Sequence, residues 1–91
     1  MTKVLTIGDT NRAGDLQIVD TQWDSNGTLR VTVRDLVGIG GRLEGVPLEA
    51  MRKLARRAIS HPEQTRSART IRTFRAEGCD YATFAVTRLD R

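Results

Sequence analysis

The chain has 91 residues, which is enough for one domain with a single core and too few for a second domain. Its net charge is +4, and its single cysteine, Cys79, excludes both an intramolecular disulfide and a zinc site built from paired cysteines. Because no apolar run approaches the roughly 20 residues that span a bilayer, and the N-terminus lacks a signal-peptide core, we expect a soluble, cytoplasmic protein.

The first half of the chain predicts a short strand followed by a β-hairpin. The strand is KVLTI, residues 3–7, and the turn-forming sequence GDTNRAGD follows it. Residues 16–36 then contain two β-rich runs around Asn26-Gly27. A three-residue loop with Gly27 left-handed gives this hairpin one apolar face, whereas a two-residue loop mixes apolar and polar side chains on both faces.

The three-residue loop is the register that we predict, because a slip of one residue reverses the direction of every side chain. It pairs Trp23 with Leu29, Thr21 with Val31 and Val19 with Val33. Trp23 and Tyr81 are candidate anchors for a partner, although we expect Trp23 in the core. The opposite face of the hairpin then carries Ile18, Asp20, Gln22, Arg30, Thr32 and Arg34.

A glycine-rich connector, residues 37–45, leads to a helix predicted over residues 47–60. Pro47 suits a first helical position, and His61-Pro62 supplies the stop. At the helical period the apolar residues fall within an arc of about 140°, the width expected of a helix packed on one side. These residues are Leu48, Met51, Leu54, Ala55, Ala58 and Ile59, and opposite them lie Glu49, Lys53, Arg56, Arg57 and Ser60.

Residues 62–77 allow either a helix or a strand. Ser60 and Glu63 have capping-box spacing, which favours a helix, but the apolar residues of the segment spread around a helical wheel and leave no side to bury. The β-forming residues 70–74, together with YATFAVTRL after Gly78, favour an antiparallel hairpin. We therefore predict a strand with Arg69 and Arg75 on one face and Arg72 on the other, and the register of this hairpin stays open.

These elements predict one α+β domain over residues 1–91, in the order strand, hairpin, helix, hairpin. The mainly antiparallel sheet would have four to five strands packed on the single amphipathic helix. Since a helix about 10 Å wide shields roughly two strands spaced about 4.8 Å apart, we expect part of the apolar sheet to be uncovered. Exposed apolar patches mark interfaces, so we expect a homodimer.

Few residues suit catalysis. His61 lies between a helix end and a proline with no nucleophile placed beside it, and Cys79 has no identifiable partner. The glycines at 38, 40, 41 and 45 precede the helix but match neither phosphate-loop pattern. We expect no enzyme activity, no cofactor site and no metal site.

The charge is distributed unevenly along the chain. Residues 1–50 hold five basic and seven acidic side chains, whereas residues 51–91 hold ten basic and four acidic. Such a field favours acidic partners, and thirteen of the fifteen basic residues are arginine, which suits bidentate contacts to carboxylate or phosphate. The predicted partner-binding residues are Arg30, Arg34, Lys53, Arg56, Arg57 and Arg72.

The sequence thus favours a non-catalytic protein-interaction module, accessory or regulatory, that docks an acidic protein surface. Its composition is typical of small proteins from GC-rich bacteria or their phages. The alternative is sequence-independent nucleic-acid binding through the basic C-terminal half, although four aromatic residues are few for such a protein.

Overall fold

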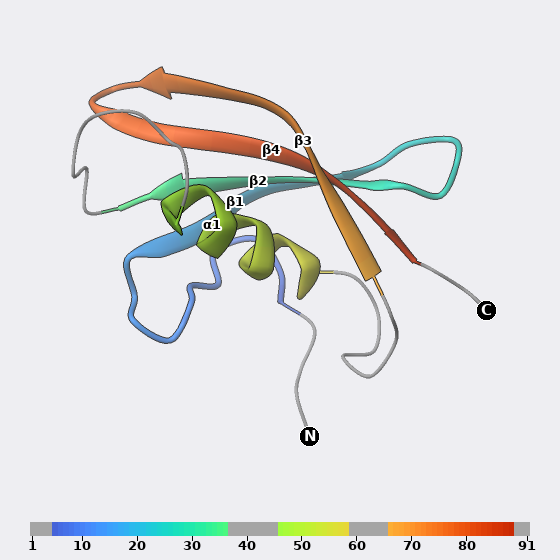
Figure 1. The fold of residues 1–91 in the computed structure, drawn as a ribbon, viewed down its shortest axis with the longest axis horizontal. Helices are drawn as coiled ribbons and strands as arrows, with labels where there is room; N and C mark the ends of the chain where they lie inside the picture. The colour runs from blue at the N-terminus through green and yellow to red at the C-terminus, as the bar shows by residue number, and fades with distance from the viewer. Residues whose placement is uncertain (1–4, 37–45, 59–65, 89–91) are drawn as a thin grey trace.

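In the computed structural model of the chain, residues 5–36, 46–58 and 66–88 are described. They form one antiparallel sheet of four strands with one helix packed on one side of it (Figure 1). The α+β class is therefore confirmed. The strands are β1 (Leu16–Trp23), β2 (Leu29–Asp35), β3 (Arg66–Ala76) and β4 (Cys79–Arg88), and the helix is α1 (Val46–Arg56). Their order across the sheet is β1-β2-β4-β3, so the two hairpins meet where β2 pairs with β4.

The N-terminal segment differs from the prediction. Residues 1–4 lie outside the described chain, and Leu5 to Ile7, the rest of the predicted strand, are not a strand. Instead, the Leu5 N–H donates a hydrogen bond to the Arg57 carbonyl at 2.8 Å, and the Leu5 side chain is buried with the core. Thr10 makes one isolated bridge with Gln17 of β1. The segment thus packs at the end of α1 and adds no fifth strand.

The first hairpin confirms the predicted three-residue loop. Gly27 has a φ of 81°, and the Asp24 N–H donates to the Thr28 carbonyl at 3.0 Å to close the turn. Trp23 pairs with Leu29 and Thr21 with Val31, as expected. The pairing of Val19 with Val33 is wrong, because the register shifts between Ile18 and Asp20 and Ile18 pairs with Val33. Ile18, predicted on the outer face, is therefore fully buried.

The core lies between α1 and the sheet. Met51, Leu54, Ala55 and Ala58 are buried as the helical arc predicts, and Leu48 is partly buried, whereas the predicted final turn, residues 59–60, lies outside the described range. Burial of a side chain as large as Met51 stabilises the fold by about 1.5–3 kcal/mol. The strands contribute Leu16, Ile18, Leu29, Val31, Val33, Ala82, Phe84 and Val86 to this cluster.

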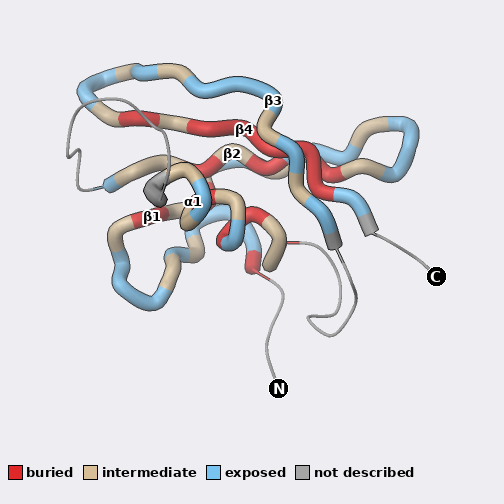
Figure 2. Tube along the Cα trace, in the orientation of Figure 1, coloured by how far each residue is buried: buried red, intermediate tan, exposed pale blue. Residues whose placement is uncertain are grey.

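The expectation that one helix leaves apolar sheet uncovered is wrong for most of this face and holds at the tip of the first hairpin, where Trp23 lies on the helix side. α1 packs against all four strands, and Figure 2 shows buried residues along β1, β2, β4 and α1. The outermost strand, β3, needs little cover because it turns small or polar residues, including Ala68 and Thr70, toward the helix side. Trp23, predicted in the core, is 60% exposed. It lies near the tip of the first hairpin, which extends away from α1 (Figure 1).

The second hairpin settles the open choice between helix and strand. Residues 66–76 are the strand β3, and Glu77 and Gly78 form a two-residue loop in which both residues have positive φ, as in a type I′ turn. A register shift between Thr70 and Arg72 leaves Ile71 as an extra residue. Arg69 and Arg72 consequently share a face and Arg75 lies on the other, so the predicted arrangement of these arginines is wrong.

Within the described ranges, no helix is long and apolar enough to cross a membrane.

Candidate functional site

The face of the sheet opposite α1 is the candidate site, and we call it the open face. No described helix lies against it (Figure 1). Directly paired residues of an antiparallel sheet share a face, so the register gives its side chains row by row. The first row is Gln22, Arg30, Ala85 and Arg69, the second is Asp20, Thr32, Thr83 and Arg72, and the third is Gln17, Arg34, Tyr81 and Phe74.

Four arginines and one carboxylate give the open face its charge. Arg30, Arg69 and Arg72 are exposed and, among the residues that the structure describes, none of them has an ion-pair partner. Arg34 is half-buried, and its Nη2 donates to the Gln17 Oε1 at 2.9 Å. Asp20 is the single acidic residue in the three rows. The open face is therefore a positively charged surface whose guanidinium donors are largely unused.

Two aromatic rings stand in the third row. Phe74 and Tyr81, paired across β3 and β4, stack with their centroids 4.9 Å apart and their planes within 3° of parallel. The Arg72 guanidinium carbon lies 4.7 Å from the centroid of the Phe74 ring. This cation–π contact and the ring stack orient Arg72, and they leave the Phe74 ring already in contact with two neighbours.

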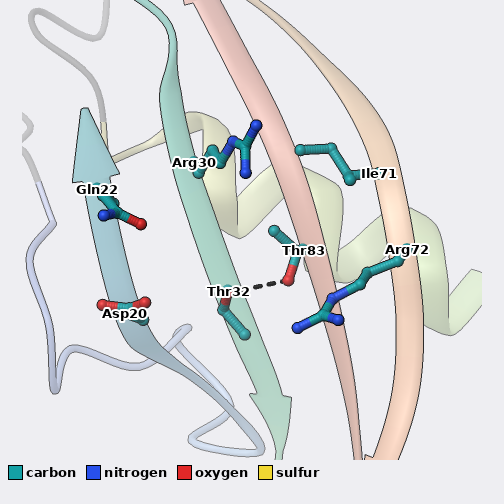
Figure 3. A pocket seen from close by; sticks show the side chains of 7 residues that line it. All are labelled: Asp20, Gln22, Arg30, Thr32, Ile71, Arg72 and Thr83. Carbon is teal, nitrogen blue, oxygen red and sulfur yellow. Dashed lines mark hydrogen bonds between the residues drawn. The ribbon is translucent and has the colours of Figure 1, made fainter. Parts of the chain in front are cut away.

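A shallow trough of about 370 Å³ crosses the open face (Figure 3). Arg30 from β2 and Arg72 from β3 extend over β4 from opposite sides, and between them the Thr32 and Thr83 hydroxyls lie 3.0 Å apart. Guanidinium groups beside hydroxyls suit an oxyanion such as phosphate or carboxylate, and the volume falls within the range of ligand sites. The complete lining is Asp20, Gln22, Arg30, Thr32, Ile71, Arg72 and Thr83.

The six residues predicted to bind a partner do not form one surface. Arg30, Arg34 and Arg72 lie together on the open face. The other three, Lys53, Arg56 and Arg57, belong to α1 and its final turn, on the opposite side of the sheet. Sequence reasoning missed Arg69 as a site residue because strict alternation put it on the face opposite Arg72, and no residue pattern marks the extra residue in β3.

Two further arginines hold the fold together. Arg52 of α1 pairs with Glu49, donates from its Nη2 to the Thr70 Oγ1 at 3.0 Å, and lies 5.9 Å from the centroid of the Phe84 ring. Arg75 donates from its Nη1 to the Oδ1 of the buried Asp80 at 2.7 Å. Arg52 and Arg75 are therefore used by the structure, whereas Arg30, Arg69 and Arg72 have no ion-pair partner among the described residues.

The residues considered for catalysis are not among those that line the trough. His61 and the four glycines of the connector lie outside the described residues, and Cys79 is half-buried in β4. In the described part of the chain, no three His, Cys, Asp or Glu side chains come close enough together to hold a metal ion. No protein-family model, curated protein or solved structure matches the chain significantly. The open face is therefore the feature that bears on function.

Proposed function

We propose that the protein is a non-catalytic cytoplasmic module that binds the phosphate backbone of a nucleic acid on the open face, without reading base sequence. The observation that supports this proposal is the convergence of Arg30, Arg69 and Arg72, from two separate hairpins, on one face where the described chain offers them no ion-pair partner. Arginine is suited to phosphate because its planar group donates two hydrogen bonds at once. Phosphate contacts supply affinity without carrying sequence information.

The charge of the open face argues against using it for the homodimer that the sequence predicted. That prediction assumed an uncovered apolar sheet, whereas the open face carries arginines and threonines. Two copies facing each other through it would oppose four guanidinium groups with four more, and like charges across an interface are unfavourable. We therefore propose an anionic partner for this face in place of a second copy.

An acidic protein, which the sequence favoured, is the second candidate. It is supported by the position of β3, which is 11 residues long and lies at the edge of the sheet. An extended segment of a partner could add beside β3 and direct acidic side chains to Arg69 and Arg72. Both candidates use the same arginines, so the ligand has to be distinguished by experiment.

The test measures binding of a fluorescent single-stranded oligonucleotide by anisotropy between 50 and 200 mM salt. The double variant R30E/R72E changes two residues of the open face, and R56E/R57E makes the same change of charge at the end of α1. We expect the wild type to lose affinity steeply with salt, and R30E/R72E to lower the slope of log K against log salt by about 1.4, the value for two phosphate contacts to a single strand. We expect R56E/R57E to retain most of the binding.

Three results would contradict the proposal in different ways. No binding by the wild type at 50 mM salt would exclude a nucleic-acid ligand. Equal losses in the two variants would show that net charge and not the open face is responsible. Binding of poly-glutamate with no binding of the oligonucleotide would support the acidic protein instead.

A further inference from the structure

Phosphate binding by the arginines of the open face gives no role to the exposed side chain of Trp23. It is the only tryptophan of the chain, and it is 60% exposed at the end of β1. It lines a second pocket, of about 280 Å³, which we call the tip pocket. The other residues of the tip pocket are Gln22, Asp24 and Arg30. Because Gln22 and Arg30 also line the trough, the two pockets adjoin. Trp23 pairs with Leu29 and so belongs to the helix side of the sheet, and the tip pocket joins it to the open face around the edge strand β1.

Hydrogen bonds within the turn fix the backbone next to Trp23. The Asp24 Oδ1 accepts hydrogen bonds from the N–H groups of Asn26 at 2.8 Å and Thr28 at 3.1 Å. These contacts engage the Asp24 carboxylate in the turn and fix the chain directly after Trp23. The acidic residue nearest to Trp23 in the chain is therefore part of the turn structure, and Arg30 supplies the cation of the tip pocket.

We propose that Trp23 stacks an unpaired base while Arg30 holds a neighbouring phosphate, so that a nucleic acid bound by the open face is single-stranded where it passes the edge of the sheet at β1. This inference rests on the proposed function and names the form of its ligand. A base inside a duplex is already stacked on both sides and cannot cover the ring, whereas every unpaired base offers a π-face. An apolar protein surface is the poorer partner, because the three residues that share the tip pocket with Trp23 are polar or charged.

The sole tryptophan is also the probe for the experiment. Titration of the wild type with single-stranded oligothymidine should quench Trp23 fluorescence, since a stacked base lies against the indole. W23A should weaken single-strand binding about 5- to 150-fold, the loss expected for one stacked base, and should leave duplex binding unchanged. W23F retains a ring and should lose less. I7A is the matched control, because Ile7 is 57% exposed and is not part of either pocket.

The outcomes separate this inference from the proposal on which it rests. If the oligonucleotide binds with no change in Trp23 fluorescence, or if W23A weakens duplex and single-strand binding equally, base stacking is wrong and phosphate binding stands. If no nucleic acid binds the wild type at all, the proposed function fails and this inference with it. Because the fluorescence titration uses the unaltered chain, the test does not depend on whether W23A folds.

Discussion

At the scale of single residues, substitutions of two arginines of β3 should affect different properties, stability for Arg75 and oligonucleotide binding for Arg69. Arg75 donates to the buried Asp80 and to the Gly78 carbonyl, whereas Arg69 has no ion-pair partner among the described residues. Removing Arg75 leaves the Asp80 carboxylate buried without its cation. Because the Arg75 side chain is 47% exposed and therefore screened, we expect Arg75→Ala to lower the free energy of unfolding by only about 1–2 kcal/mol. Urea denaturation measures this change.

Arg69→Ala is the control on the same strand. It should change the free energy of unfolding by less than about 0.5 kcal/mol, as exposed substitutions usually do, yet it should weaken oligonucleotide binding. Arg75→Ala should keep the binding and lose stability. If the two variants were equally unstable, the division between structural and ligand-binding arginines would be incorrect.

At the scale of elements, the extra residue in β3 decides which arginines reach the open face. Thr70 pairs with Phe84 and Arg72 with Thr83, so Ile71 has no paired position of its own. Deleting Ile71 should restore simple alternation while keeping Arg72 opposite Thr83, and the side chain that it removes from the trough lining is apolar and has no donor for phosphate. We expect this variant to fold and to bind oligonucleotide, as urea denaturation and anisotropy will show.

Deleting Thr73 should instead remove Arg72 from the open face. Because the Glu77-Gly78 turn fixes the pairs from Ala76 to Phe74, the deletion shifts Arg72 opposite Ala82, on the helix side, and puts Ile71 opposite Thr83. We expect this variant to bind oligonucleotide more weakly than the Ile71 deletion does. Equal binding by the two deletions would mean that Ile71 is not a spare position in β3.

The register shifts in β1, between Ile18 and Asp20, and in β3, between Thr70 and Arg72, are the part of the fold that the sequence does not predict. Gly27 and the helical arc around Met51 are local signals, and they gave the loop of the first hairpin and the buried side of α1 correctly. A bulge has no such signal, because its place depends on which side chains fit across the strands, as when Ile18 takes the core position opposite Val33. Trp23 is exposed for a tertiary reason as well, since the hairpin extends away from the helix that would have covered it.

At the scale of the whole molecule, the charge of the open face bears on self-association. Most of the apolar side of the sheet is buried against α1, and the open face would repel a copy of itself. We therefore expect light scattering at low salt to give the mass of one copy. Association through the open face would need added salt to screen its charge. A dimer at low salt that R30E/R72E leaves intact would show that another surface joins the copies.

The pairing of β2 with β4 also determines when the cationic surface comes into existence. Thr32 and Thr83, which touch at this junction, are 51 positions apart in the sequence, whereas each hairpin closes over a few residues. Contacts between distant segments require a long loop to close, so they form late in folding. Neither hairpin alone carries Arg30 and Arg72 together. A polyanion bound to both hairpins would therefore stabilise the pairing of β2 with β4, the last contact to form, and would slow the separation of the two halves of the chain.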